Sequence, residues 1–270
     1  MRALSWTFVP WVLAPIALAA LLFALGGIRR PDSPGLRRRA LLFALGLATL
    51  FGALVSPLHD AGERFFAPHM IQHELLMLVV PPLLVAAEPL AVMLRALPAG
   101  MRAAIGGIFA APPIATAWRW LTACIPATLL QIAALWLWHA PPLFDLALAS
   151  PGWHAVQHLC FLGSALLFWT AILRWRKGEA SPFQRCALAV LCLFVTSIAS
   201  GALGALLALS DTVWYAPYAG FGPDPFGLSP TQDQQLAGLI MWIPGGLVHT
   251  VAALMIVHTL LTGRRLADAR

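Results

Sequence analysis

Long apolar segments alternate with short polar connections along most of the chain. A helix that crosses a membrane needs about 20 mostly apolar residues, and the sequence contains seven such segments. They run over Thr7–Ile28, Arg39–Pro57, Pro68–Ala87, Ala117–Trp138, Gly152–Leu173, Phe183–Leu209 and Thr231–Thr262. The pattern predicts an all-α integral membrane protein, with residues 1–270 forming a single domain of seven transmembrane helices.

The composition supports this interpretation. Hydrophobic residues make up 60% of the chain and charged residues 10%, with a mean hydropathy of +0.81, which excludes a water-soluble domain of this length. The first apolar segment lacks a small-residue cleavage site and is followed by Arg29 and Arg30. We therefore expect a retained helix and not a removed signal peptide.

Basic residues are distributed unequally between the two sides of the predicted bundle. Fifteen of the seventeen lie in alternate connections and the C-terminal tail, whereas the opposite side has only Arg2 and Arg64. Connections rich in arginine and lysine stay on the cytoplasmic side of a membrane. The distribution predicts an outer N-terminus and a cytoplasmic C-terminus.

Two copies of an H-x-x-Q-H pattern open two of the apolar segments, at residues 69–73 and 154–158. Residues four apart lie on the same face of a helix, so each pair points two imidazoles in one direction. Six of the eight histidines fall at the predicted outer ends of helices: His59, His69, His73, His139, His154 and His158. We expect them to meet in one chamber near the outer surface.

A weak internal repeat accompanies these motifs. Pro57-Leu58-His59-Asp60 precedes the first H-x-x-Q-H pattern, and Pro142-Leu143-Phe144-Asp145 precedes the second. Each copy predicts an outward-facing hairpin with histidine at both ends, and two such hairpins side by side would surround a pocket with imidazole.

The chemistry of the cluster favours a metal ion. Imidazole suits zinc, copper, nickel and iron, and affinity peaks at copper; a thioether four residues after His73 adds a soft donor for Cu(I). The predicted copper ligands are His69, His73, His154, His158, His139, His59 and Met77. Four polar residues are available to orient the imidazoles: Asp60, Gln72, Glu74 and Gln157.

Two alternatives from other functional classes stay open. A membrane cytochrome could hold haem between one histidine from each motif, such as His73 and His158. A copper transporter is suggested by Pro81-Pro82 and Pro244-Gly245-Gly246, which predict kinked or broken helices, and by His249 in the last segment.

Other chemistries are disfavoured. The run from His73 to Met77 resembles the zinc-protease pattern H-E-x-x-H but ends in methionine. The four cysteines lie in apolar segments without a C-x-x-C pair, which argues against a disulfide framework or a thiolate zinc site. No nucleophile–base pair or nucleotide fingerprint occurs, so we expect neither an enzyme nor a nucleic-acid partner.

Two features near the last segment concern the outer surface. The loop over residues 210–230 is rich in glycine, proline and aromatic residues and predicts a lid, with Trp214, Tyr215, Tyr218, Phe221 and Phe226. Thr231-Gln232-Asp233-Gln234 fits a capping box that starts the last helix.

The run PHMIQHELLMLVVPPLLV at 68–85 resembles the hallmark segment of the polytopic CtaG family of cytochrome c oxidase assembly factors. WHAPPLFDLAL at 138–148, WHAVQHLCF at 153–161 and GLIMWIPGGLVH at 238–249 are similar to that family too. The resemblance implies a seven-helix protein of the bacterial plasma membrane that delivers copper to a haem-copper oxidase. Its partners would be cytochrome c oxidase subunits and soluble copper chaperones of the outer face. The matching positions are His69, Gln72, His73, His139, Asp145, His154 and His158.

Overall fold

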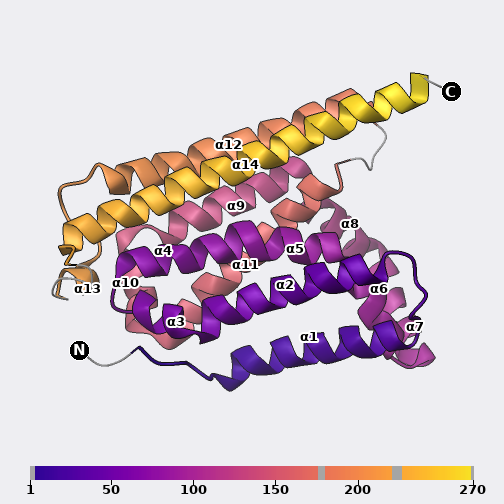
Figure 1. Ribbon diagram of the computed structural model, residues 1–270, viewed down its shortest axis with the longest axis horizontal. Coiled ribbons are helices and arrows are strands. Elements are labelled where there is room, and N and C mark those ends of the chain that lie inside the picture. The colour runs from indigo at the N-terminus through magenta and orange to yellow at the C-terminus, as the bar shows by residue number, and fades with distance from the viewer. Residues whose placement is uncertain (1–3, 176–179, 221–226, 269–270) are drawn as a thin grey trace.

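The computed structural model describes residues 4–175, 180–220 and 227–268. These residues form helices and turns, with no strand among them (Figure 1), so the all-α prediction is confirmed. In chain order the elements are α1 (Pro10–Ile28), α2 (Leu36–Val55), α3 (Pro57–Gly62), α4 (Phe66–Glu74), η1 (Leu75–Val79), α5 (Val80–Ala87), α6 (Pro89–Met93), η2 (Leu94–Ala96), α7 (Ala99–Ala110), α8 (Pro112–Leu121), α9 (Cys124–Trp138), α10 (Pro141–Ala149), α11 (Pro151–Leu173), α12 (Pro182–Ala208), α13 (Ala216–Ala219) and α14 (Pro230–Asp268).

Six helical segments in the described part of the chain are long and apolar enough to cross a membrane. They are α1, α2, the unit α4–η1–α5, α11, α12 and residues 230–263 of α14. The remaining predicted segment corresponds to α8 and α9, which are bent by 67° and make a seventh span if the pair is counted as one. Pro126 cannot donate a hydrogen bond to the carbonyl of Thr122, which explains why the helix stops between the two parts.

The long helices lie nearly parallel (Figure 1), with α12 and α14 along one face and α1 at the opposite edge. The backbones of α12 and α14 approach closely at two glycines. A β-carbon at Gly238 would lie 2.5 Å from the carbonyl oxygen of Gly204. Small residues permit this close packing of membrane helices.

Proline affects the two predicted break points differently. Before Pro81 and Pro82 the helix widens into the π-helical turn η1. The carbonyl of Met77 loses its usual partner because Pro81 has no N–H, and the indole of Trp169 donates to it at 2.9 Å instead. The predicted break at Pro244 is absent, since this residue lies inside the continuous helix α14.

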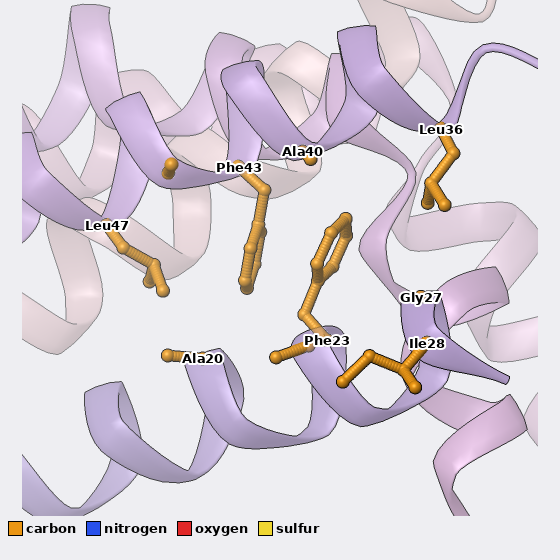
Figure 2. Close-up of a pocket in the computed structure, with 10 residues that line it drawn as sticks. Ala20, Phe23, Gly27, Ile28, Leu36, Ala40, Phe43 and Leu47 are labelled. Atoms are coloured by element: carbon orange, nitrogen blue, oxygen red, sulfur yellow. The ribbon is translucent and has the colours of Figure 1, made fainter. Parts of the chain in front are cut away.

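Helix α1 packs against α2 at the edge of the bundle through an aromatic contact. Phe23 stacks on Phe43 of α2 with ring centroids 4.3 Å apart, and an apolar cavity of about 470 Å³ lies beside them (Figure 2). At the same end, Arg29 donates to the carbonyl of Arg95 and Arg39 pairs with Glu88 at 2.6 Å. Two arginine-rich connections therefore meet at one end of the bundle.

Candidate metal centre

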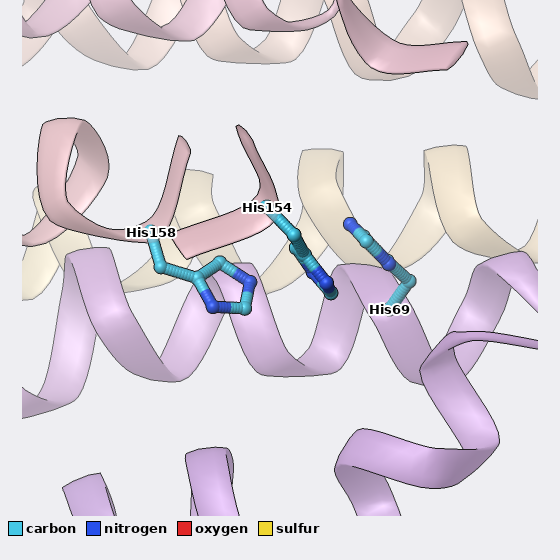
Figure 3. Close-up of side chains that lie close together, drawn as sticks. All are labelled: His69, His154 and His158. Atoms are coloured by element: carbon cyan, nitrogen blue, oxygen red, sulfur yellow. The ribbon is translucent and has the colours of Figure 1, made fainter. Parts of the chain in front are cut away.

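The two H-x-x-Q-H motifs face each other across the bundle, from α4 and from α11. The ring centroids of His69 and His154 are 5.2 Å apart, and those of His73 and His158 are 5.5 Å apart. All four residues are buried. Figure 3 shows His154 and His158 pointing from α11 toward His69 on α4. The structure therefore brings the two predicted pairs into one chamber.

Three of these residues are arranged so that a single ion could bind them. His69, His154 and His158 each offer a ring nitrogen, and the three nitrogens lie within 4.8 Å of one another. Nitrogens bound to one ion at about 2 Å lie no more than about 4 Å apart. Side-chain movements of roughly 1 Å would therefore complete a three-nitrogen site.

Hydrogen bonds to carbonyls determine which nitrogen of two rings is available. The Nδ1 atom of His69 lies 3.2 Å from the carbonyl oxygen of Gly62, and that of His139 lies 2.7 Å from the carbonyl oxygen of Leu135. A carbonyl only accepts, so Nδ1 carries the proton and Nε2 has the lone pair. Both Nε2 atoms, and both nitrogens of His73, are buried without a partner among the described residues.

The glutamine of each motif repeats the same contact. The Nε2 amide of Gln72 donates to the carbonyl of Ala53 at 2.8 Å, and that of Gln157 donates to the carbonyl of Trp138 at 3.4 Å. The two glutamines lie 85 positions apart in the sequence, and so do the two residues whose carbonyls accept these hydrogen bonds. These hydrogen bonds link α4 to the end of α2 and α11 to the end of α9. The two hairpins therefore repeat the same contact.

His59 and His139 lie on opposite sides of the four motif histidines. His59 is half-buried and stacks on His154 with centroids 5.4 Å apart, whereas His139 is buried and lies 5.7 Å from His73. Beside His59 the exposed Glu63 approaches to 3.8 Å. Sequence reasoning missed Glu63, although its position four residues after His59 was a usable signal.

Three other predicted residues are directed elsewhere. Asp60 pairs with Arg64 at 2.9 Å and accepts from the backbone of Ser5. The carboxylate of Glu74 faces α14, where a β-carbon at Gly245 would lie 3.6 Å from it. Met77 is buried within the main hydrophobic cluster.

Two tyrosines of the predicted lid, Tyr215 and Tyr218, cover one end of the chamber. The hydroxyl of Tyr215 donates to the carbonyl of His139 at 2.9 Å, and that of Tyr218 donates to the carbonyl of Gly62 at 2.7 Å. Phe144 lies beneath them, stacked on Tyr215 at 4.0 Å and 5.0 Å from the ring of His69. Trp214 is tied to α14 through Gln234, while Phe221 and Phe226 lie outside the described residues.

The start of α4 is secured by a carboxylate from α14. Asp233 accepts from the backbone amides of Phe66 at 2.6 Å and Ala67 at 3.0 Å. The capping box that starts α14 is formed two residues earlier than predicted, between Ser229 and Gln232. Asp233 caps the helix that carries His69 and His73.

Burial shifts the pKa of several groups that lie outside the membrane-spanning segments, next to the chamber. Burial lowers the pKa of His139 to about 4, so its imidazole is uncharged at neutral pH. Burial, followed by the charge of Asp233, raises the pKa of Tyr218, so its phenol stays protonated and donates. Burial also raises the pKa of Asp145. Neutral imidazole is the form that binds metal ions.

Comparison with known proteins gives the family. A family model described as cytochrome c oxidase caa3 assembly factor (Caa3_CtaG) matches residues 11–262. Uncharacterized proteins of Mycobacterium bovis and Mycobacterium tuberculosis are each 28% identical over 252 residues, which cover 88% of this chain and 36% of the relative. The chain thus spans about a third of the length of these relatives, and no solved structure matches it. Since the family match covers nearly the whole chain, the protein belongs to the cytochrome c oxidase caa3 assembly factor family, and the resemblance to CtaG is confirmed.

Proposed function

We propose that the protein is a membrane-embedded metallochaperone that binds copper, as Cu(I), in the histidine chamber and delivers it to a haem-copper cytochrome c oxidase. The observation that carries the proposal is the convergence of buried imidazoles from two hairpins, with His69, His154 and His158 close enough for one ion. An assembly factor of this kind has a non-catalytic role, and copper is its cargo.

The charge of the chamber favours a monovalent ion. Imidazole binds a metal ion in its neutral form, so the three inner histidines would bring no charge to the ion, and the carboxylate of Glu74 points toward α14. The cost of moving an ion from water into a medium of low dielectric constant rises steeply with its charge, and none of the three inner ligands is an anion that would offset it. Copper is bound well by imidazole and has an accessible monovalent state, unlike zinc.

The aromatic lid supports a holding role. Tyr215 and Tyr218 are buried and close the outer end of the chamber together with Phe144. Their hydroxyls donate to the carbonyls of His139 and Gly62, which also fixes the backbone beside the ligands. A covered, rigid chamber would keep Cu(I) from water until a partner receives it.

The proposed orientation places the chamber at the outer face of the bacterial plasma membrane. The contacts of Arg29, Arg39 and Arg95 gather at the end of the bundle where α1 finishes and α2 begins, and positive charge favours the cytoplasmic side. The histidines lie at the other end of α2. Oxidase subunits, and soluble copper chaperones of the outer face, would then exchange copper on that side.

Elemental analysis of detergent-purified protein loaded with Cu(I) tests the proposal. The double variant His154→Ala/His158→Ala removes two of the three inner ligands and should lose at least nine-tenths of the bound copper at limiting metal, since losing a ligand weakens a site by tenfold or more for each residue. His258→Ala is the matched control, because His258 is exposed near the opposite end of α14. A double variant with the full copper content of the wild type would contradict the proposal.

The two alternatives, a haem-binding cytochrome and a copper transporter, have less structural support than copper delivery. A haem would need open space beside the histidine rings. Phe161 lies 4.6 Å from the ring of His73 and Phe144 lies 5.0 Å from the ring of His69, so this space is filled. For a transporter, continuous α14 removes one of the two broken helices on which that hypothesis depends. A visible spectrum of the purified protein distinguishes haem by its Soret band.

A further inference from the structure

One histidine belongs to two different groups of potential ligands. His69, His154 and His158 form the inner group, and His59, Glu63 and His154 form a second group whose ligand atoms also lie within 4.8 Å of one another. His154 is the residue that the two groups share. The second group includes an exposed carboxylate, whereas all members of the first are buried.

The ring of His154 stacks on the rings of His69 and His59. It lies 5.2 Å from His69 with an interplanar angle of 9°, and 5.4 Å from His59 with an angle of 22°. An ion that stays bound to His154 therefore needs to move only a short distance to leave one group and join the other. Exchange of one ligand at a time avoids releasing a bare ion into the membrane.

Open space lies beside the second group and beside two members of the inner group, His154 and His158. A cavity of about 470 Å³ between α1 and α11 is lined by His59, Glu63, His154 and His158, together with apolar side chains of α1 and α2. The side chain of Glu63 is 54% exposed and that of His59 is 16% exposed. Exposure to solvent thus increases from the inner group, through His59, to Glu63.

A hydrogen bond from the amide of Gln72 orients the ring of His59, a member of the second group. This amide donates to the carbonyl of Ala53 and, at 2.9 Å, to Nδ1 of His59. Nδ1 is then the acceptor, so the ring proton is on Nε2, which faces Glu63. His59 becomes a ligand through Nε2 when that proton moves to Nδ1 and Gln72 turns its Oε1 atom, buried without a partner in the described structure, toward it.

We propose that the protein holds Cu(I) at two successive positions, an inner one at His69, His154 and His158 and an outer one at His59, Glu63 and His154. The ion passes between them by ligand exchange around His154, and Glu63 is the last protein ligand before a receiving partner. No electron is transferred, and His59 keeps one ring proton throughout. This inference rests on the proposed function and adds to it a route and a new residue, Glu63.

The rate of copper release tests the route. Full-length protein loaded with one equivalent of Cu(I) in detergent is mixed with excess bathocuproine disulfonate, and the absorbance of the copper chelate is followed by stopped flow. Glu63→Gln should slow release by about tenfold while the protein still binds one equivalent of Cu(I), because the inner position is intact. His59→Asn should slow release in the same way. Asp211→Asn neutralises an exposed carboxylate in the outer loop and should release copper like the wild type.

The possible failures are distinguishable. Release from Glu63→Gln and His59→Asn at the wild-type rate, with full copper content, would overturn the two-position route and leave the proposed function standing. Loss of bound copper from Glu63→Gln would place the carboxylate in the tight site and also overturn the route. Absence of copper binding by the wild type would instead remove the proposed function itself.

Discussion

Removing the carboxylate of Asp233 should loosen the helix that carries the first histidine pair. Asp233 lies on α14 and accepts two hydrogen bonds from the first amides of α4, at 2.6 Å and 3.0 Å. Hydrogen bonds to a charged group contribute about 1.5–3 kcal/mol each, and buried donors without a partner add to the loss. Asp233→Ala should therefore lower the free energy of unfolding by about 3 kcal/mol, and Asp233→Asn, which keeps one acceptor oxygen, by about half as much.

Reversible unfolding by sodium dodecyl sulfate in mixed micelles, followed by tryptophan fluorescence, measures this loss. A Cu(I) competition titration on the same samples should show weaker binding by about tenfold for Asp233→Ala, because His69 lies in the first turn of the loosened helix. Asp211→Asn, which changes an exposed carboxylate in the loop after α12, should change neither quantity. If Asp233→Ala unfolds at the wild-type detergent fraction, the carboxylate does not stabilise α4 and the explanation is wrong.

Three further predictions concern packing, protonation and the lid. Gly238→Ala should cost about 2 kcal/mol in the same unfolding assay because its β-carbon would collide with the backbone of α12, whereas Gly163→Ala, with no atom within 4 Å, should cost nothing. Since the folded pKa of His139 is about 4, the unfolded chain binds more protons between pH 6.5 and 4, and stability should fall as the pH falls through this window, by up to about 3 kcal/mol more than in His139→Asn. Tyr218→Phe loses the hydrogen bond to Gly62 and should weaken Cu(I) binding by about tenfold at unchanged stoichiometry, measured by competition titration.

The helices and the meeting of the two motifs could be predicted because both depend on local patterns. An apolar run of about 20 residues has few structures other than a spanning helix, and six of the predicted segments match single spans of the structure within a few residues. The i, i+4 spacing of His69 and His73 sets a common face without any knowledge of the rest of the chain. The repeated motif supplied the reason to expect a partner for that face.

The remaining features depend on contacts between distant residues. Asp233 reaches amides 166 and 167 positions away, and Tyr218 reaches a carbonyl 156 positions away. No local pattern marks a carboxylate as the cap of another helix, so the sequence does not predict this role for Asp233. Glu63 was missed for a different reason, since a single exposed glutamate is ordinary on a protein surface, and only the position of His154 gives it a second partner.

The two hairpins carry equivalent histidine pairs, but the residues around these pairs differ. This difference makes the two sides of the chamber unequal. Shifting His59 and Glu63 by the 85 residues of the repeat leads to Phe144 and Leu148. Phe144 is buried and stacked under Tyr215, so the second hairpin closes its side of the chamber where the first presents an imidazole and an exposed carboxylate. A fully symmetric pair of hairpins would offer an ion two equivalent exits. Because an aromatic wall replaces one exit among the described residues, the proposed ligand exchange around His154 leads past Glu63, and replacing this one carboxylate should slow release without weakening the inner site.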